Sequence, residues 1–266
     1  MKEKIISIIN QKGGVGKTTT VINLAAGLSL NNKKVLVVDL DPQGNATTGL
    51  GLSNIDQTSN SIYQVLIGTK KIDEAISNTN FSNLDIITSN VDLSGLEVET
   101  ADDGRRAYIL KEKLTAYLND SRASYDYVLI DCPPSLSLLT VMALVASHSL
   151  LVPLQTEFFA LEGITQLIKT IDRIKLGLNS ELTIRGILLT MYDKRNKLSG
   201  EVETEARNYF KEKVYKNVVP RNVRLSEAPS HGMPVIFYDK NCLGSKSYIN
   251  FTEEFLAQEE SFETAA

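Results

Sequence analysis

Residues 12–19, with the sequence KGGVGKTT, have the composition of a loop that binds phosphate groups. The apolar run Ile5–Ile9 precedes them and the helix-like stretch Val21–Leu28 follows. In this order, glycines let consecutive backbone N–H groups point at one anion, and the helix N-terminus adds the positive end of its dipole. We expect Lys17 to reach the β- and γ-phosphates of a nucleotide and the Thr18 hydroxyl to bind Mg²⁺. The order of elements argues against a plain glycine-rich turn. The expected nucleotide-binding residues are Lys12, Gly13, Gly14, Val15, Gly16, Lys17, Thr18 and Thr19.

The loop departs from the common pattern G-x-x-x-x-G-K-[ST], because Gln11 stands where that pattern has its first glycine. A second lysine, Lys12, stands directly before the glycines instead. A lysine is often merely solvated, but a cation at this position is close to the bound phosphates. The segment resembles the deviant Walker A loop of the ParA/MinD group of P-loop ATPases. The resemblance implies that Lys12 crosses a dimer interface and contacts the nucleotide of the partner subunit.

Two aspartates follow apolar runs and are candidates for catalysis and metal binding. Asp41 lies in the segment DLDPQGN after Val35–Val38, and we expect it beside the γ-phosphate, where it would hold or polarise the attacking water. A simple turn is the alternative, since Asp-Pro and glycine both form turns. Asp131 follows Tyr127–Ile130 and is typical of a Walker B aspartate, which holds a water bound to Mg²⁺. Its alternative is a helix N-cap before proline. We expect catalysis to rest on Lys12, Lys17, Asp41 and Asp131.

Apolar runs of strand length recur along the chain and must position these groups. Besides the three runs already named, Ser149–Val152 and Ile184–Thr190 have this character. Runs that are apolar on both faces and separated by helix-length segments indicate a parallel sheet covered on both sides. We therefore predict an α/β fold with a mostly parallel twisted sheet and helices on both faces. Ligands gather outside the carboxyl ends of the strands in such sheets. The predicted helices are Arg105–Leu118, Leu161–Ile174, Glu201–Phe210 and Ser247–Leu256.

Two segments need separate interpretation. Residues 53–90 are polar and rich in Ser, Thr and Asn, and we expect an elaboration on the edge of the sheet. Residues 132–156 contain no charged side chain and have the length of a membrane-spanning helix. Because three prolines and His148 interrupt them, we interpret them as a buried helix near Leu136–Ala146 and an inner strand, Ser149–Leu154.

Composition narrows the class of protein. With 266 residues, of which 42% are hydrophobic, the chain can bury a substantial core, and we expect a single P-loop ATPase domain over residues 1–266. The net charge of −4 gives no global attraction to nucleic acid. Cys132 and Cys242 are isolated, which disfavours a disulfide framework or a zinc site and makes a reducing cytosol the default. The first apolar run is too short for a signal peptide.

Further strings extend the resemblance over nearly the whole chain and make it more specific. They are YDYVLIDCPPS (125–135), FFALEG (158–163), GILLTMYD (186–193) and VPRNVRLSEAPSHG (219–232). These strings resemble the ParA/Soj chromosome- and plasmid-partition ATPases. The resemblance implies that Pro220 and Asn222 contact adenine, although a surface loop explains Asn222 equally well. It also implies a Mg-ATP-dependent homodimer that coats DNA without sequence specificity, hydrolyses ATP slowly and is stimulated by a ParB-type centromere-binding partner.

Basic residues are concentrated in one part of the chain. Residues 185–224 contain ten Lys or Arg and five Asp or Glu, while the whole chain is negative. Phosphate contacts need only a local basic patch, so we expect DNA binding on the nucleoid through Arg195, Arg221 and Arg224. A solvated helical face of mixed charge is the alternative.

Related functions remain as alternatives. The chain begins at its first strand, so we expect no separate N-terminal helix-turn-helix domain. After Lys246 the chain has no basic residue and several glutamates, which disfavours a membrane-binding tail and hence a MinD-like positioning ATPase acting on membranes or protein assemblies. A P-loop small-molecule kinase or ligase would have glycine at position 11 and no need of Lys12. Nitrogenase iron proteins need cluster-ligating cysteines, which two isolated thiols do not obviously supply.

Overall fold

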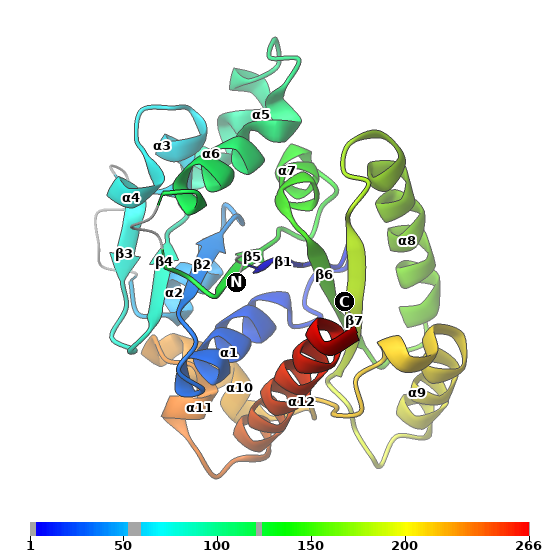
Figure 1. The fold of residues 1–266 in the computed structure, drawn as a ribbon. Coiled ribbons are helices and arrows are strands. Elements are labelled where there is room, and N and C mark those ends of the chain that lie inside the picture. The colour runs from blue at the N-terminus through cyan, green and yellow to red at the C-terminus, as the bar shows by residue number, and fades with distance from the viewer. Residues whose placement is uncertain (1–3, 53–59, 121–123, 266) are drawn as a thin grey trace.

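A seven-stranded sheet forms the centre of the chain in the computed structural model, which describes residues 4–52, 60–120 and 124–265 (Figure 1). The strand order is β3-β4-β2-β5-β1-β6-β7, and every pairing is parallel except that of β3 with β4. The strands are β1 (Lys4–Ile8), β2 (Val35–Asp39), β3 (Ile76–Asn78), β4 (Leu84–Ile87), β5 (Tyr127–Asp131), β6 (Ser149–Gln155) and β7 (Thr183–Thr190). The predicted mostly parallel α/β fold is confirmed.

Helices cover both faces of the sheet (Figure 1). On one face lie α1 (Lys17–Leu30), α2 (Asn45–Gly49), α10 (Val223–Glu227), α11 (Val235–Tyr238) and α12 (Leu243–Ala265). On the other face lie α3 (Ile62–Leu66), α4 (Ile72–Ala75), α5 (Leu96–Glu99), α6 (Ile109–Leu118), α7 (Leu138–Ala146), α8 (Ala160–Gly177) and α9 (Lys197–Phe210).

Each face of the sheet has its own buried core because successive strand residues point to opposite sides. In β2, Val35 and Val37 pack with α1 and α12, whereas Leu36 and Val38 pack with α3, α6 and α7. A third cluster joins the opposite side of β6 and β7 to α8 and α9. Because these strands are buried on both faces, their sequences are continuous apolar runs.

The predicted elements are present, and their bounds differ mainly at the ends. Helix α9 begins at Lys197 and α12 begins at Leu243, each four residues before the predicted start, and the N-terminal part of Arg105–Leu118 is a short 3₁₀ turn. The segment 53–90 is more than an edge elaboration over its described part, 60–90. Its β3 lies at the edge, but β4 is an interior strand that pairs in parallel with β2. The expectation of one domain over residues 1–266 stays a prediction.

The close approach of α1 and α12 gives a test of the packing. A Cβ atom added at Gly27 of α1 would lie 2.2 Å from Thr252 Oγ1 and 3.0 Å from Thr252 Cβ, and Thr252 is buried in α12. We expect Gly27→Ala to lower the free energy of unfolding by about 1–3 kcal/mol, because overpacking outweighs the better helix propensity of alanine. Urea unfolding measures the change.

Gly163 is the matched control, since it lies inside α8 and an added Cβ meets no heavy atom within 4 Å. Gly163→Ala should leave stability unchanged or raise it by up to about 1 kcal/mol. Equal responses of the two variants would contradict the tight α1–α12 contact.

Candidate functional site

The loop of residues 12–19, here called the P-loop, connects β1 to α1 at the carboxyl edge of the sheet. Gly14 and Gly16 adopt φ angles of 73° and 90°, a left-handed conformation that glycine adopts without strain. Gly16 is also the residue directly before α1, so the helix N-terminus opens into the loop. The Thr190 hydroxyl at the end of β7 donates a 2.9 Å hydrogen bond to the carbonyl of Val15 and holds the loop from outside.

Lys17 is buried, with only 6% of its surface exposed. Its ammonium donates a 3.0 Å hydrogen bond to the carbonyl of Lys12, so the side chain folds back over the P-loop. Burial lowers the pKa of Lys17, and the nearby Asp131 and Asp41 charges act in the opposite direction. A cation held in a desolvated loop interacts strongly with any anion that enters.

Lys12 differs from Lys17, because its ammonium forms an ion pair with Glu157. Its side chain is half exposed, at 50%, and its backbone N–H donates to the Asn10 side chain at 3.0 Å. Glu157 lies two residues after the end of β6. The analysis of the sequence missed it, because only the fold brings residue 157 to residue 12.

A cavity of about 590 Å³ opens beside the P-loop. Three segments from different strand ends line it together with Met191. They contribute Gly13, Gly14, Gly16, Lys17, Thr18 and Thr19 from the P-loop, Asp41, Pro42, Gln43 and Asn45 after β2, and Pro133, Pro134 and Ser135 after β5. The structure thus brings together the predicted P-loop and Asp41 in one cavity, and Lys12 is not part of its lining.

Asp39 and Asp131 end the adjacent strands β2 and β5 and face each other in register. Both are completely buried. Burial raises the pKa of Asp39 to about 6, although hydrogen bonds from Thr47 and Asp41 act in the opposite direction. Burial and the Asp39 carboxyl also raise the pKa of Asp131, while Thr18 and Lys17 act to lower it. The importance of Asp39 was missed, because in the sequence it appears as the start of a turn.

Neither carboxylate oxygen of Asp131 meets hydrogen-bond geometry with another atom of the described residues. A buried carboxylate without such a partner costs free energy. Together with the Thr18 hydroxyl, it offers the oxygen ligands that Mg²⁺ prefers, either directly or through water. These residues therefore fit a hydrated Mg²⁺ ion.

Asp41 is buried to 7% exposure, and its Oδ1 accepts a 3.0 Å hydrogen bond from the backbone N–H of Gln43. This contact is a turn stabilised by the aspartate side chain, so the structural role considered for Asp41 is present. The residue also lines the cavity beside Lys17. The two roles are compatible.

Pro220 and Asn222 are not among the residues that line this cavity. Pro220 pairs with Tyr192, the neighbour of Met191, and so lies next to the cavity wall. The Asn222 side chain accepts a 3.0 Å hydrogen bond from the Arg224 N–H and caps α10. Their contact with adenine stays a prediction.

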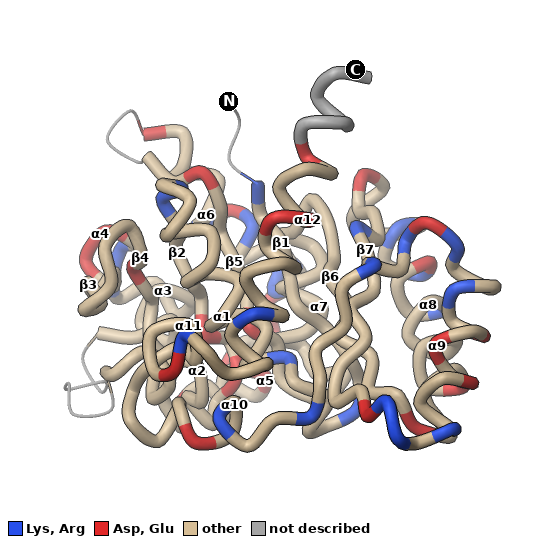
Figure 2. The backbone as a smooth tube through the Cα atoms, turned by 90° about the horizontal axis from the view of Figure 1, so that it is seen from below, with Lys and Arg blue, Asp and Glu red and all other residues tan. Residues whose placement is uncertain are grey.

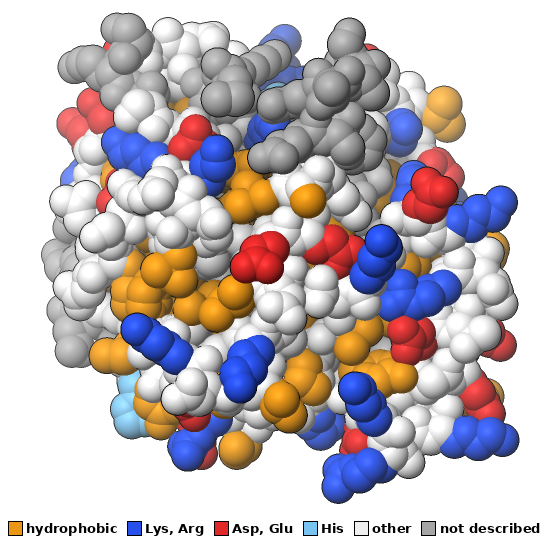
Figure 3. All heavy atoms as spheres, turned by 60° about the horizontal axis from the view of Figure 1, so that its bottom comes forward, with side chains coloured by type: hydrophobic (Ala, Val, Ile, Leu, Met, Phe, Trp, Pro, Cys, Tyr) orange, Lys and Arg blue, Asp and Glu red, His pale blue; other side chains and the backbone are white. Residues whose placement is uncertain are grey.

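A second cavity, of about 640 Å³, is lined by five basic residues and one acidic residue and is here called the basic groove. Its basic residues are Lys194, Arg195, Lys216, Arg221 and Lys246. Figure 2 shows basic positions in the loops along this side of the molecule, and Figure 3 shows Lys and Arg side chains spread over it with hydrophobic side chains between them. Arg195 also pairs with Asp193, whose pKa it lowers to about 2.

The three predicted DNA-binding arginines are only partly brought together. Arg195 and Arg221 line the basic groove, whereas Arg224 is not among its lining residues. Arg224 pairs instead with Glu227 at 2.7 Å and Asp239 at 3.5 Å. Sequence reasoning did not select Lys216 or Lys246, because α12 approaches the loop after β7 only in the folded chain.

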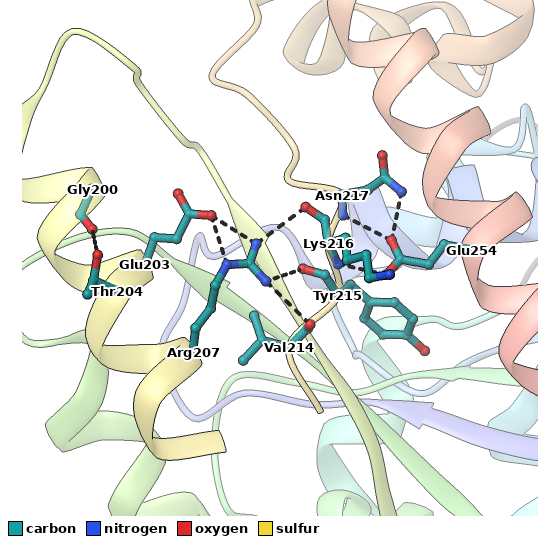
Figure 4. Close-up of polar contacts among 9 residues, drawn as sticks. All are labelled: Gly200, Glu203, Thr204, Arg207, Val214, Tyr215, Lys216, Asn217 and Glu254. Carbon is teal, nitrogen blue, oxygen red and sulfur yellow. Dashed lines mark hydrogen bonds and ion pairs between the residues drawn. The ribbon is translucent and has the colours of Figure 1, made fainter. Parts of the chain in front are cut away.

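Two further basic residues from the same part of the sequence have structural partners, and Figure 4 shows the first of them, Arg207. Arg207 of α9 donates to the carbonyls of Val214, Tyr215 and Lys216 at 3.5, 3.1 and 3.3 Å. Glu254 of α12 accepts hydrogen bonds from the N–H groups of Lys216 and Asn217 at 2.7 and 2.9 Å. The two side chains hold the segment 214–217 that carries Lys216 into the groove.

Arg185 is the second basic residue that the fold uses internally. Its side chain is only 8% exposed, forms an ion pair with Glu259 and packs over the ring of Phe255. Arg185 therefore fixes α12 to β7 and is not part of a basic surface.

No helix among the described residues is long and apolar enough to cross a bilayer.

Comparison with known proteins gives relatives over nearly the full chain. A family model described as "AAA domain" matches residues 3–184. The chain is 49% identical over 256 residues to the chromosome partitioning protein ParA of Caulobacter vibrioides, covering 96% of this chain and 95% of that protein. It is 48% identical over 254 residues to the sporulation initiation inhibitor protein Soj of Bacillus subtilis, covering 96% and 98%.

Solved structures with the same fold contain nucleotides. Cobyrinic acid a,c-diamide synthase from Mycobacterium smegmatis, with an ATP analogue and magnesium, has a TM-score of 0.85 at 32% identity, covering 97% of this chain and 96% of that chain. A plasmid partition protein from Borrelia burgdorferi bound to AMPPNP has a TM-score of 0.81 at 30% identity, covering 97% and 100%. The septum site-determining protein MinD from Pyrococcus horikoshii with Mg-ADP has a TM-score of 0.78 at 28% identity, covering 95% of each chain.

The contrast between Asp39 and Asp131 gives a test of the site without nucleotide or metal. Asp131 is completely buried, and burial and Asp39 raise its pKa despite Thr18 and Lys17, so Asp131→Asn, which removes a buried negative charge, should raise the free energy of unfolding by about 1–3 kcal/mol at pH 8. The pKa of Asp131 is higher in the folded state than in the unfolded state. Ionisation of Asp131 therefore lowers the stability of the fold as the pH rises above the unfolded-state pKa. The gain should therefore shrink toward pH 5. Chemical unfolding in EDTA at both pH values measures it.

Asp39→Asn is the control, because Asp39 accepts hydrogen bonds from Thr47 and Asp41 that an amide cannot fully replace. It should lower stability at pH 8. If both variants lose stability equally, Asp131 has partners that the site as described lacks.

Proposed function

This chain belongs to the ParA/Soj family of chromosome-partitioning proteins, and we propose that it is a Mg-ATP-dependent, dimerising ATPase that binds DNA without sequence specificity and drives the segregation of plasmids or chromosomes. The observation that carries the proposal is the separation of the two P-loop lysines. Lys17 lines the cavity, while Lys12 is not among its lining residues and forms an ion pair with Glu157. A cation beside the phosphate loop but outside its own cavity is available to a neighbouring subunit.

The residues around the cavity have different roles in ATP hydrolysis. The P-loop N–H groups and Lys17 bind the phosphates and neutralise the charge that develops on the γ-phosphoryl group. Asp41 orients a water whose oxygen attacks the γ-phosphorus. The bond to the bridging oxygen then breaks, and ADP and inorganic phosphate leave. Thr18 and Asp131 would hold Mg²⁺, which supplies further neutralisation of phosphate charge when bound.

ATP couples this chemistry to assembly. Two chains face each other across their nucleotides, and Lys12 leaves Glu157 to contact the phosphates of the partner subunit. Contacts of the Lys12 ammonium to a triphosphate are charge-assisted and offset the loss of its partly exposed ion pair with Glu157. Hydrolysis removes the γ-phosphate, and the dimer then loses the contacts to it that hold the two subunits together.

The basic groove is the DNA-binding surface in this proposal. Its five cations lie on one face and outnumber the single acidic residue, Asp193. A dimer doubles the number of phosphate contacts, so affinity for DNA rises when ATP is bound. A ParB-type partner stimulates the ATPase and releases the protein from DNA, and the protein acts on the nucleoid.

Two alternatives have weaker support. The MinD structure and the diamide synthase structure share 28% and 32% identity with this chain. The ParA and Soj relatives share 49% and 48% over almost the whole length of both proteins. The partition function is therefore preferred over membrane positioning and over metabolic amide synthesis.

The two lysines give the most direct test of the proposed function. Lys17→Ala should lose ATP binding, because it removes the buried charge of the phosphate site. Lys12→Ala should retain ATP binding to the monomer and lose the ATP-dependent dimer. Calorimetry measures binding, and size-exclusion chromatography with light scattering measures assembly. A normal ATP dimer formed by Lys12→Ala contradicts the contact across subunits. Lys169→Ala, at an exposed lysine of α8, is the control for loss of a surface charge.

The basic groove gives a test of DNA binding. The double variant Arg195→Glu/Arg221→Glu should weaken binding to unrelated duplexes alike by at least about tenfold at low salt, because each reversal removes a phosphate contact and adds a repulsive charge. ATP-dependent dimerisation should be unchanged. Mobility shifts over a salt series measure affinity, and the log–log slope should become shallower by about 0.9 per lost contact.

Lys169→Glu/Arg173→Glu on α8 carries the same change of charge away from the groove and should bind as wild type. Arg224→Glu should have a smaller effect than either groove substitution, since Arg224 is not among the residues that line the basic groove. Equal losses in the α8 and groove variants would show that net charge alone governs binding. Absence of ATP-stimulated binding by wild type would refute the DNA function.

A further inference from the structure

Thr47 is a completely buried residue in α2, six residues after Asp41. Its backbone N–H and its hydroxyl both donate to Asp39 Oδ2, at 2.8 and 2.7 Å. The same hydroxyl accepts a 3.0 Å hydrogen bond from the backbone N–H of Ser89, just beyond β4. The Thr47 side chain thus connects β2, α2 and the end of β4, and every one of these groups is buried.

Asp39 extends this network to the residue that faces the nucleotide cavity. Its second oxygen, Oδ1, accepts a 3.3 Å hydrogen bond from the backbone N–H of Asp41. One carboxylate therefore holds the backbone of Asp41 with one oxygen and Thr47 with the other. The chain between them is a tight turn, in which the Gly44 N–H donates to the Asp41 carbonyl at 2.9 Å.

The turn that follows Asp41 is itself constrained, and so it limits where Asp41 can lie. Gly44 adopts a φ of 63°, and a Cβ at this position would lie 3.5 Å from the carbonyl of Ser89. The segment from Asp41 to Thr47 is thus fixed at its first residue by Asp39, at its last by Asp39 and Ser89, and in between by the hydrogen bond from the Gly44 N–H to the Asp41 carbonyl.

We propose that Thr47 is a positioning residue for ATP hydrolysis, which acts through Asp39 to place Asp41 against the attacking water. The inference rests on the proposed role of Asp41. Thr47 is completely buried and is not among the residues that line the cavity, so its contribution is to the chemical step and not to binding. Removing a hydroxyl that is both donor and acceptor leaves the Ser89 N–H without this acceptor and leaves Asp39 Oδ2 with the hydrogen bond from the Thr47 N–H in place of two.

The test is the isosteric substitution Thr47→Val. We expect kcat to fall at least about tenfold while the KM for ATP and the affinity for a non-hydrolysable analogue change less than about threefold. A misplacement of a catalytic group by about 1 Å is sufficient for a loss of this size. Thr47→Ser keeps the hydroxyl and should restore kcat to within about threefold of wild type.

Thr88→Val is the matched control for a structural effect. Thr88 is buried next to Ser89, but its hydroxyl donates to the Asn60 carbonyl at 2.9 Å and not to the Asp41 segment. Both valine variants lose one buried hydroxyl and should lose similar stability in urea unfolding. Only Thr47→Val should lose kcat. Equal losses of kcat in both would mean that the effect is one of general stability and would overturn the proposal.

A double-variant cycle with Asp41→Ala separates this inference from the proposed function. If Thr47 acts through Asp41, Thr47→Val should cause no further loss of turnover in the Asp41→Ala background. The same fold loss in both backgrounds contradicts the inference alone. Wild-type turnover by Asp41→Ala refutes the catalytic role of Asp41 and the inference with it. Loss of turnover in Asp41→Ala together with a normal kcat in Thr47→Val leaves the proposed function intact and refutes the inference.

Discussion

The buried charges at the carboxyl edge of the sheet are the constraint on which the rest of the structure depends. Lys17, Asp39 and Asp131 are almost fully removed from water within one small region. Burial of ionised groups is costly unless hydrogen bonds or opposite charges compensate for it. Thr47 and Asp41 donate hydrogen bonds to Asp39, and Thr18 and Lys17 favour the charged form of Asp131, but burial still raises the pKa of both carboxyl groups. The site therefore suits a ligand whose negatively charged phosphates meet Lys17 and whose bound metal cation meets the carboxylates.

The parallel sheet makes this concentration of charge possible. Strands β1, β2 and β5 are neighbours, so the P-loop, Asp39 and Asp131 leave the sheet at the same edge. Strand β7 extends the arrangement to the second surface. Met191, directly after β7, lines the nucleotide cavity, and the next residue, Tyr192, pairs with Pro220 and lines the basic groove. The two candidate sites therefore share one short backbone segment, and in the proposed function this segment couples nucleotide binding to DNA binding.

The sequence predicted those features that depend on local order. The P-loop, Asp41 and Asp131 each follow a buried strand, and the apolar runs made these strands visible. Strand β4 was missed because it is short and carries Asp85, whose charge hides an otherwise apolar run, although its carboxylate accepts a hydrogen bond from the Tyr125 hydroxyl in the fold.

Features that depend on long-range packing were not predictable in this way. Lys246 joins Lys194 in the basic groove only because α12 packs back across the molecule. Arg185 and Arg207 increase the basic charge of their segment, yet they contact Glu259 and backbone carbonyls in the structure. A count of charges along the sequence does not distinguish these structural roles from a binding surface.

Thermal unfolding of the wild-type chain with a non-hydrolysable ATP analogue, in Mg²⁺ and in EDTA, tests the central claim most directly. A ligand that binds only the folded state stabilises it by mass action. If the buried carboxylates form a site for a nucleotide with its metal, the analogue should raise the melting temperature by several degrees more in Mg²⁺ than in EDTA. An equal rise in both, or no rise in either, would contradict the account.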